Sequence, residues 1–559
     1  MSAAATQHIV AVAGGREVAF RRVGSGPPVV LLHASPRSSI AVMPLAQHLA
    51  QKFTVFAFDT PGFGLSEPLP FARADADVFA NALLEAFDAI GLGRVPLFGS
   101  HTGAVIAMEF ARRYPARVAC LAFDGYPVFT PLEQAEALAS YLMPIRPDWE
   151  GTYLAWLWSR VRDQLVFFPW YTRGSGTRLP IDTQPLAFHQ AVLNDFLSAG
   201  DHYRVAYAAA FRYEPIAPIG EVKVPVSYIT RTDDMLFPHL DRMPPLTAKD
   251  EIVRLTEDRA VWAATTTTAM SRAAGDAAAP SSAGFDDPDM KDTRIARRIV
   301  QVPGGQVMIR VAGTRGAKPI VLIHGTPAAS RGLEPVMRAL AAKRRVIALD
   351  LPGHGGSSPA DAQTTVEAMA ATLMTALTSL KLGGADIVGF EGGAAVAAAL
   401  ARQLPNAGRC IAVDPLPESD SARNALRAQL VDIAPVWGGG HLLAAWHHLR
   451  DAELWKPWFD RRLAAGRQLG ADQDVAALDA GLAEWMRGGE SYLHAARAML
   501  SASPGAALRG TKAIVIGFDS DPDLAAAQAT AQAANARFVA TSRHAEHIAA
   551  TILHATEAP

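Results

Sequence analysis

The chain contains two copies of one sequence pattern. The apolar run VVLLH at residues 29–33 recurs as IVLIH at 320–324, and the loop DTPGFGLS at 59–66 recurs as DLPGHGGS at 350–357. Both pairs lie 291 residues apart. A repeating unit of roughly 260 residues is far longer than the repeat of a solenoid protein. The pattern therefore predicts two tandem globular domains of one fold.

The sequence between the two copies changes in composition. Residues 263–288 are rich in Ala, Thr, Ser, Gly and Pro and carry few large apolar side chains. We interpret them as the core of a flexible linker at 261–294, between a first domain at 1–260 and a second at 295–559. Because alanine runs favour helix, a surface helix is the alternative interpretation.

The charge balance and the cysteine content indicate which binding partners and which cellular compartment to expect for this protein. The 52 basic and 54 acidic residues nearly balance, so nothing indicates a nucleic acid or a membrane surface as partner. No apolar run reaches the ~20 residues of a membrane span, and residues 1–8 lack the pattern of a signal peptide. Only two cysteines occur, Cys120 and Cys410, and they are partners in the repeat. We expect two buried strand thiols in a reducing, cytoplasmic compartment.

Each copy alternates apolar strands, glycine turns and alanine-rich helices, an order that predicts an α/β fold with a mostly parallel sheet. Two segments depart from this pattern, at about 129–210 and about 416–501. Both are rich in Trp and Phe and have helical character. We expect them to form helical caps inserted after the sixth strand of each domain, with some rings lining an apolar substrate pocket.

Three motifs carry a family resemblance. They are the loops HASP at 33–36 and HGTP at 324–327, the D-x-P-G-x-G-x-S loop noted above, and the glycine-flanked turns GSHTG at 99–103 and GFEGG at 389–393. With these motifs the chain resembles the α/β-hydrolase fold superfamily over nearly its whole length. The resemblance implies two tandem domains, each a mostly parallel sheet flanked by helices with a helical cap, and an enzyme that needs neither cofactor nor metal.

The glycine-flanked turn corresponds to the nucleophile elbow of that superfamily. In register with the glycines, the nucleophile position holds His101 in the first copy and Glu391 in the second. Neither is the Ser, Cys or Asp of the family. A shifted register would place Ser100 there, but it would need small residues at Phe98 and Thr102.

The resemblance also indicates where acids and a histidine belong. The acid after the seventh strand corresponds to Asp234 and Asp521, and a second acid position after the sixth strand corresponds to Asp124. The histidine loop after the last strand holds His544 in the second copy, with His547 as alternative. In the first copy the same loop holds Asp258 and no histidine. Each copy would thus keep an acid–imidazole pair, as His101 with an acid or as Glu391 with His544 and Asp521, unless the second copy has decayed.

The remaining site residues follow from the same motifs. We expect the oxyanion-hole donors to be the backbone N–H groups of Ser35 and Thr102 in the first domain and of Thr326 and Gly392 in the second. Arginines in the caps fit a substrate carboxylate, although cap-fixing salt bridges are the alternative. The expected substrate-binding residues are His33, Trp158, Arg162, Trp170, Trp446 and Arg450.

The combined prediction is a cofactor-free hydrolase of an ester, lactone or C–X bond. Its substrate would be a small apolar or aromatic molecule, including one with a carboxylate, and His101 would act as base or nucleophile. We expect no metal, and the two domains to form an internal pseudo-dimer in which the first is the better candidate for activity. The alternatives are a cofactor-independent lyase or isomerase of the same fold, and a binding or scaffold protein with one or both domains inactive.

Overall fold

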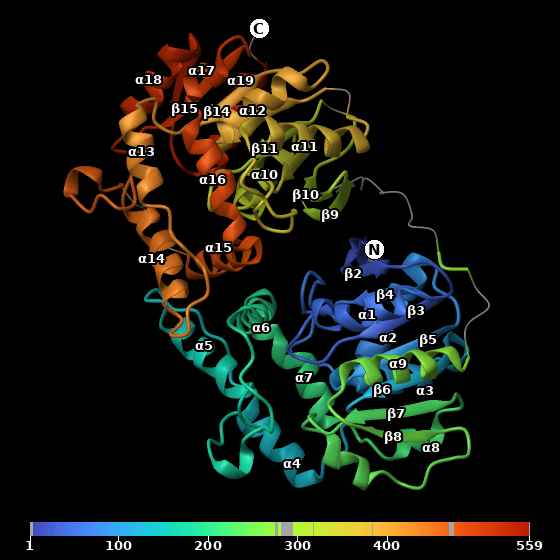
Figure 1. Cartoon of the computed structure of the whole chain (residues 1–559). Coiled ribbons are helices and arrows are strands. Elements are labelled where there is room, and N and C mark those ends of the chain that lie inside the picture. The colour runs from blue at the N-terminus through green and yellow to red at the C-terminus, as the bar shows by residue number, and fades with distance from the viewer. Residues whose placement is uncertain are drawn as a thin grey trace. The chain divides into compact units, whose positions relative to one another are not determined.

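The computed structural model describes residues 4–273, 278–280, 294–316, 318–382, 384–468 and 474–557. Within these ranges the chain forms two compact units (Figure 1). The first comprises Met1–Arg146 and Trp156–Gly284, and the second Pro147–Ala155 and Phe285–Pro559. Two tandem domains are therefore confirmed, and residues 147–155, which include the first residues of α5 (Thr152–Gln164), are grouped with the second unit.

An eight-stranded sheet forms the centre of the first unit, in the order β1-β2-β4-β3-β5-β6-β7-β8. The pairs β1–β2 and β2–β4 are antiparallel, and all other pairs are parallel. Every residue of β3 and β4 is buried, as expected for apolar strands covered on both faces. The strands are β1 (Thr6–Ala11), β2 (Glu17–Val23), β3 (Pro28–Leu32), β4 (Thr54–Phe58), β5 (Val95–Ser100), β6 (Val118–Asp124), β7 (Val226–Arg231) and β8 (Glu251–Leu255).

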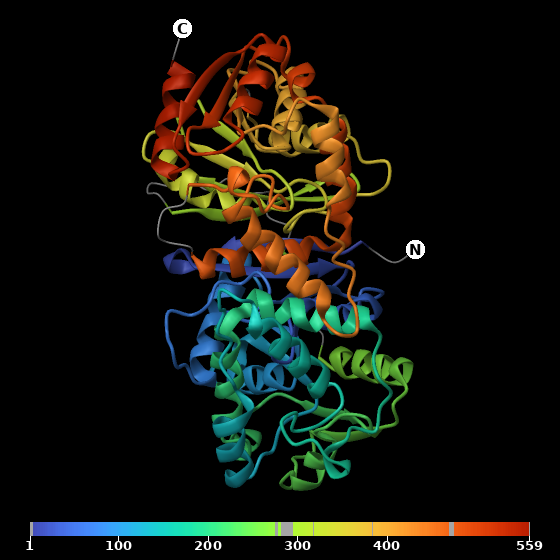
Figure 2. The same cartoon turned by 90° about the vertical axis from the view of Figure 1, so that its left-hand side faces the viewer.

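Helices cover both faces of this sheet and add a cap between β6 and β7. The flanking helices are α1 (Met43–Leu49) and α9 (Arg259–Ser271) on one face, with α2 (Ala76–Ile90), α3 (Thr102–Arg113) and α8 (Ala217–Glu221) in the other layer. The cap helices are α4 (Pro131–Glu136), α5 (Thr152–Gln164), α6 (Leu186–Ala199) and α7 (Tyr203–Arg212). Their teal-to-green ribbons lie left of the sheet in Figure 1 and face the viewer in Figure 2.

Helix α9 corrects the predicted linker. It spans Arg259–Ser271 and so overlaps the start of the segment that composition marks as flexible, and it buries Ala263 and Met270 against the sheet. The prediction that the linker starts at 261 is therefore wrong, and the helical alternative holds for this part. Alanine supplies helix propensity here, and the apolar face supplies packing energy that composition alone does not reveal. Much of the rest of the predicted linker, 274–277 and 281–293, lies outside the described residues.

The second unit repeats the architecture, with an eight-stranded sheet in the equivalent order β9-β10-β12-β11-β13-β14-β15-β16. Cys120 on β6 and Cys410 on β14 are both buried and unbridged, as predicted. The strands are β9 (Ala296–Val302), β10 (Gly305–Ala312), β11 (Ile320–Ile323), β12 (Val346–Leu349), β13 (Asp386–Phe390), β14 (Cys410–Val413), β15 (Ala513–Phe518) and β16 (Arg537–Thr541).

Helices surround the second sheet in the same way. The flanking helices are α10 (Glu334–Ala341), α11 (Val366–Ser379), α12 (Gly393–Gln403), α17 (Pro504–Leu508), α18 (Leu524–Ala534) and α19 (Ala545–Glu557). The cap helices are α13 (Asp420–Ala428), α14 (Gly440–Leu454), α15 (Val475–Gly488) and α16 (Tyr492–Ser501). None of the described helices combines the length and apolarity that a membrane span requires.

The D-x-P-G loops of both copies are built alike. In the first domain the Asp59 carboxylate accepts hydrogen bonds from the backbone N–H groups of Ser39 at 2.7 Å and Leu65 at 3.0 Å. In the second, Asp350 accepts from Ser330 and Gly356 at 2.8 and 2.9 Å. The motif thus satisfies buried backbone donors near the carboxyl ends of the strands, and its role is structural.

Candidate active site

His101 lies on the sharp turn between β5 and α3, as predicted. Its backbone has φ 48°, in the left-handed region that a non-glycine residue adopts only under strain. The flanking glycines allow the turn because a Cβ at Gly99 would lie 2.6 Å from the Cα of Ala104, and one at Gly103 would lie 2.8 Å from the carbonyl oxygen of His33. The register with His101 at the elbow is therefore the observed one, and the alternative with Ser100 is not.

Glu391 occupies the equivalent turn of the second domain, between β13 and α12, with φ 49°. A Cβ at Gly389 would lie 2.5 Å from the Cα of Ala394, the same restriction as in the first copy. The Glu391 side chain is packed against Gly325 of the HGTP loop, where an added Cβ would lie 2.9 Å from the Cβ of Glu391. Both copies thus keep a strained elbow.

In the first domain the elbow imidazole contacts the acid that follows β7. Nε2 of His101 lies 2.9 Å from Oδ2 and 3.1 Å from Oδ1 of Asp234. The His101 side chain is 23% exposed, and that of Asp234 is 9% exposed. A carboxylate accepts hydrogen bonds only, so Nε2 carries the proton. Nδ1 has no hydrogen-bond partner in the described part of the chain, and it is the nitrogen left for chemistry.

Electrostatics favour the charged form of this pair. Burial opposes protonation of His101, but the adjacent Asp234 carboxylate outweighs it and raises the pKa of the imidazole. Burial likewise opposes ionisation of Asp234, yet His101 together with the backbone N–H of Leu236 lowers the pKa of its carboxyl group. An imidazole held beside a buried carboxylate is the arrangement of a positioned acid or base.

Asp124, the other predicted acid, has a different partner. Its carboxylate accepts from Nη1 of Arg231 at 3.1 and 3.2 Å, and both side chains are buried. Burial raises the pKa of Asp124 to about 6, against the lowering effect of Arg231. Arg231 also pairs with Asp233 at 3.1 Å. The negative charge of Asp124 therefore helps to raise the pKa of His101, while its hydrogen bonds with Arg231 join the ends of β6 and β7.

Two residues that the sequence analysis missed complete the surroundings of His101. At Gly125, φ is 73°, and an added Cβ would lie 2.5–2.6 Å from the imidazole of His101, so this glycine makes room for the ring. His239, five residues after Asp234, is buried and accepts a hydrogen bond at Nδ1 from the N–H of Val128 at 2.9 Å. Burial lowers the pKa of His239 to about 4. The sequence signal that could have identified His239 is its place in the same loop as the predicted acid Asp234.

The expected oxyanion donors have no other acceptor in the described part of the chain. Thr102 is the first residue of α3, where a backbone N–H has no intrahelical partner. The backbone N–H of Ser35, in the HASP loop, is likewise without an acceptor, and the Ser35 hydroxyl is buried with no hydrogen-bond partner among the described residues. Thr326 and Gly392 hold the equivalent positions in the second domain. The assignment of the four residues to oxyanion holes stays a prediction.

In the second domain, the expected acid–imidazole pair does not form. His544 is exposed, and no described hydrogen bond or ion pair joins it to Glu391 or Asp521. Instead, the cap residue Lys456 lies among the carboxylates of Asp414, Asp521 and Asp523. These three acids are close enough together to hold a metal, but the ammonium group of Lys456 already forms ion pairs with all three of them. The pairing of Glu391 with His544 was therefore wrong.

The surroundings of Glu391 do not favour the ionised carboxylate that a nucleophile requires. The surrounding protein atoms and the neighbouring Asp414 raise the pKa of its carboxyl group, against the effects of Lys456 and Arg467. Arg543, rather than the adjacent His544, faces the acid position, with Nη1 4.0 Å from Asp521. The raised pKa disfavours the ionised carboxylate that would attack a substrate, and none of the described residues places an imidazole beside Glu391 to act as base.

Two further predictions for the first domain are corrected. Asp258 is the N-cap of α9, where it accepts from the N–H groups of Ala260 and Val261 at 2.8 and 3.1 Å, and it does not contact His101. His33 is 1% exposed. Its Nε2 accepts from the N–H of Thr60 at 3.0 Å, and its Nδ1 lies 2.9 Å from a backbone carbonyl. Both nitrogens are engaged, so His33 shapes the loop instead of binding substrate.

The predicted substrate-binding residues of the caps fall into two groups: tryptophans that pack the cap interior, and arginines that are only partly buried. Trp158 and Trp446 are fully buried, and Trp170 donates Nε1 to the carbonyl of Tyr141 at 3.1 Å. These rings pack the caps. Arg162 and Arg450 are half-buried on α5 and α14, and their role in substrate binding stays a prediction.

Salt bridges that fix the caps do occur, next to the predicted arginines. Asp163 pairs with Arg173 at 2.7 Å, and Asp451 pairs with Arg461 at 2.9 Å. Each acid directly follows a predicted arginine, and each partner arginine ends an equivalent segment, PWYTR at 169–173 or PWFDR at 457–461, so both copies make the same contact.

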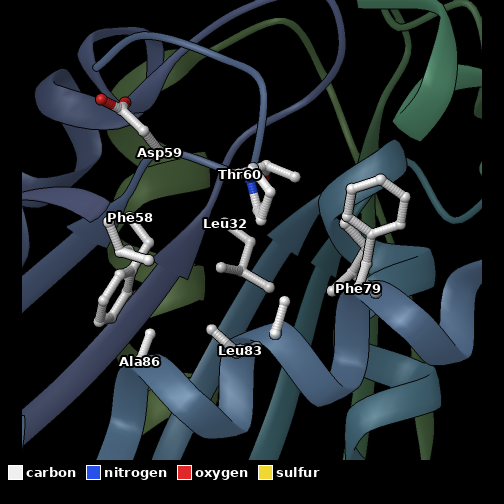
Figure 3. Close-up of a pocket in the computed structure, with 11 residues that line it drawn as sticks. Leu32, Phe58, Asp59, Thr60, Phe79, Leu83 and Ala86 are labelled. Atoms are coloured by element: carbon white, nitrogen blue, oxygen red, sulfur yellow. The ribbon is translucent and has the colours of Figure 1, made fainter. Parts of the chain in front are cut away.

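A small apolar cavity in the first domain is separate from this site. It lies between β4 and the helices α2 and α3, has a volume of about 20 Å³, and is lined by residues such as Leu32, Thr60 and Phe79. Figure 3 shows the Asp59 carboxylate directed away from the gathered apolar side chains. No candidate catalytic residue lines this cavity, which has room for about one water molecule.

Family models for the α/β hydrolase fold match both halves of the chain. One, described as the alpha/beta hydrolase fold, covers residues 27–257, and another, the alpha/beta hydrolase family, covers 320–554. The chain is a tandem pair of α/β-hydrolase domains. The sheet order, the elbows and the caps of both domains agree with this assignment.

Individual relatives are distant. An uncharacterized protein of Mycobacterium tuberculosis is 35% identical over 104 residues, which is 19% of this chain and 30% of that protein. The chain thus spans under a third of the length of the curated relatives it matches. Among solved structures, an epoxide hydrolase A from Mycobacterium thermoresistibile is 19% identical, covers 47% of this chain and 98% of its own, and gives a TM-score of 0.37. A thermophilic esterase from Thermogutta terrifontis is 19% identical, with 45% and 90% covered and a TM-score of 0.32.

Proposed function

We propose that the first domain is a cofactor-free hydrolase of small ester or lactone substrates, in which His101 acts as general base on water. One observation carries this proposal: the imidazole at the nucleophile position is itself bound to the acid of the site, Asp234, at 2.9 Å. The position that usually bears an attacking side chain therefore bears a base. A water molecule at Nδ1 then takes the place of the nucleophile.

The chemistry follows from the atoms in place. Nδ1 of His101 removes a proton from water as the water oxygen bonds to the substrate carbonyl carbon. The carbonyl electron pair moves onto its oxygen, which the N–H groups of Ser35 and Thr102 would stabilise. When the tetrahedral intermediate collapses, the bond to the leaving alkoxide breaks, and this oxygen takes the proton from His101. Asp234 stabilises the imidazolium throughout and fixes its tautomer.

A second candidate is proton transfer on a substrate C–H, as in a cofactor-independent lyase or isomerase. It is favoured by the absence of Ser, Cys or Asp at the elbow, because such chemistry needs a base and an oxyanion site but no nucleophile. The two candidates differ in the fate of solvent atoms. Hydrolysis in ¹⁸O-labelled water puts the label in the acid product, whereas C–H chemistry in D₂O exchanges deuterium into substrate or product.

For the second domain we infer a non-catalytic role. The support is that Lys456 engages its acids and that, among the described residues, none places an imidazole beside Glu391. The matched experiment is a panel of esters, lactones, epoxides and β-diketones assayed with wild type, His101→Ala and Glu391→Gln. We expect His101→Ala to abolish turnover and Glu391→Gln to retain it. The reverse result would overturn the assignment of activity to the first domain.

A further inference from the structure

A buried guanidinium group lies in the cap of the first domain, and no described residue supplies a carboxylate partner for it. Arg160, on α5, is 1% exposed. Its Nη1 donates to Oε1 of Gln164 at 2.7 Å, whereas Nε and Nη2 have no hydrogen-bond acceptor in the part of the chain that the structure describes. Buried charges in proteins are ordinarily paired, because taking an unpaired ion out of water is costly. This one requires an explanation.

Aromatic rings surround the group. The Cζ atom of Arg160 lies 4.5 Å from the ring centroid of Phe196, 4.8 Å from Trp170, 5.4 Å from Tyr203 and 5.8 Å from Tyr141. Ring faces attract a cation and replace part of its hydration. They do not offer hydrogen-bond acceptors to the N–H groups in the plane of the guanidinium. The aromatic box therefore accommodates the charge but leaves two donors unused.

The two unused donors define the kind of ligand. Nε–H and Nη2–H lie along one edge of the planar guanidinium, and this edge matches the two oxygens of a carboxylate. We propose that Arg160 and its aromatic box form a subsite for the carboxylate of an aromatic substrate. The proposal deepens the function proposed above and rests on it for the identity of the reacting end. It also moves the expected anion-binding role from Arg162 to Arg160.

A row of rings connects this box with the catalytic loop. Tyr141 lies 5.5 Å from Phe211, Phe211 lies 5.4 Å from Phe129, and Phe129 lies 5.0 Å from His239, measured between ring centroids. His239 follows Asp234 in the same loop, and the charge of His101 contributes to its lowered pKa. These contacts join the box to the loop that carries Asp234, and we therefore place the reacting end of an aromatic substrate toward that loop.

Binding to the full-length protein tests the subsite directly. The probe is benzoate, and benzamide is a neutral control of the same shape. We expect benzoate, and not benzamide, to raise the melting temperature of the wild type in a concentration-dependent way. In Arg160→Met this rise should vanish, with benzoate affinity at least about tenfold weaker, whereas Arg162→Met should retain it. Equal stabilisation of wild type and Arg160→Met by benzoate would overturn the proposal.

Stability separates a ligand role from a structural one. Without benzoate, Arg160→Met should melt at the same temperature as wild type or above it, because the variant removes an unpaired buried charge. Should that variant misfold, Arg160→Lys keeps the charge but loses the planar fork. It should fold and bind benzoate at least about tenfold more weakly. Wild-type benzoate affinity in Arg160→Lys would count against the subsite.

Two outcomes distinguish this proposal from the proposed function. His101→Ala should lose turnover yet bind benzoate like wild type, since the box does not include the elbow. If His101→Ala turns over normally while benzoate binding still requires Arg160, the function fails and the subsite stands. If the wild type ignores benzoate while His101 is essential, the subsite fails and the function stands.

Discussion

Nε2 of His101 lies 2.9 Å from Oδ2 of Asp234, and the two residues come from the elbow after β5 and the loop after β7. In the superfamily pattern, that acid serves a histidine from the loop after the last strand. Here the loop after β8 holds Asp258, which caps a helix. The elbow thus supplies the imidazole itself, and the acid–imidazole pair persists without a Ser, Cys or Asp at the elbow position.

The first prediction separates the two registers of the elbow. His101→Ala should lower kcat/KM by about a hundredfold to ten thousandfold, the range expected when a general base is removed. Ser100→Ala should keep most of the activity because Ser100 is the last residue of β5 and not the elbow residue. Both variants should retain the wild-type circular dichroism spectrum. Loss of turnover in Ser100→Ala alone would restore an ordinary serine hydrolase.

The second prediction concerns pH. A base must be neutral, so activity should rise with pH through the pKa of His101, which Asp234 raises above its usual ~6.5. Asp234→Asn removes the carboxylate and leaves burial, which lowers the pKa. The midpoint of the pH–rate profile should therefore move to lower pH, and the maximal rate should fall about tenfold or more. Identical midpoints in wild type and variant would argue against His101 as the titrating base.

The same linkage predicts a change in stability. Because folding raises the pKa of His101, the ion pair contributes stability fully below the unfolded value of ~6.5 and loses it as pH rises through the raised value. The difference in unfolding free energy between wild type and Asp234→Asn should thus be larger at pH 6 than at pH 9. Urea titrations at both pH values measure it. A difference that grows with pH would mean that the pair is not charged in the folded protein.

The third prediction tests the space around the imidazole. Gly125→Ala places a methyl group 2.5–2.6 Å from the His101 ring, so the ring must move. A misplaced base should cost about a hundredfold in kcat. Gly91→Ala is the matched control, because Gly91 has nearly the same positive φ, 74° against 73°, but nothing lies within 4 Å of its added Cβ. Both variants should lose about 1–2 kcal/mol through backbone strain, and only Gly125→Ala should lose activity.

The repeat and the strand pattern predicted the fold well. Short apolar runs that are rich in β-branched residues and bounded by turns favour buried strands over helices, and the glycines of the elbow leave a single tolerable register. The first linker boundary failed because α9 is stabilised by packing on the sheet. An alanine- and threonine-rich segment does not reveal such packing from its composition.

The site was predicted in part, for a physical reason. Elbow and acid positions follow from topology, because parallel strands end at one edge of the sheet. Topology left Asp124, Asp234 and Asp258 as candidate partners of His101, and the structure pairs it with Asp234. The ion-pair partners of the other site acids depend on which long, flexible side chain of the cap or loops extends to them in the folded domain. Lys456 reaches the acids of the second domain from the cap, where His544 was expected, and no local pattern encodes that reach.

The fourth prediction concerns this lysine. Lys456 is mostly buried and forms ion pairs with Asp414, Asp521 and Asp523. Burial opposes its charge, but the carboxylates outweigh burial and raise the pKa of the ammonium group. Its stabilising contribution is therefore complete at neutral pH and is lost only as pH rises through that raised value.

Lys456→Met should accordingly destabilise the second domain by about 3 kcal/mol at pH 7, because Asp414 and Asp523 lose their ion-pair partner while Asp521 keeps Arg467. Lys318→Met is the control in the same domain. Lys318 is 46% exposed, and its partner Asp386 keeps a second ion pair with Arg344 at 2.8 Å, so the loss should stay below about 1 kcal/mol.

Calorimetry of the full chain should show a lowered transition only for Lys456→Met, while ester hydrolysis by the first domain is unchanged. A parallel loss of hydrolysis would show that the second domain takes part in catalysis, and an unchanged transition would show that the acids of this cluster are not charged.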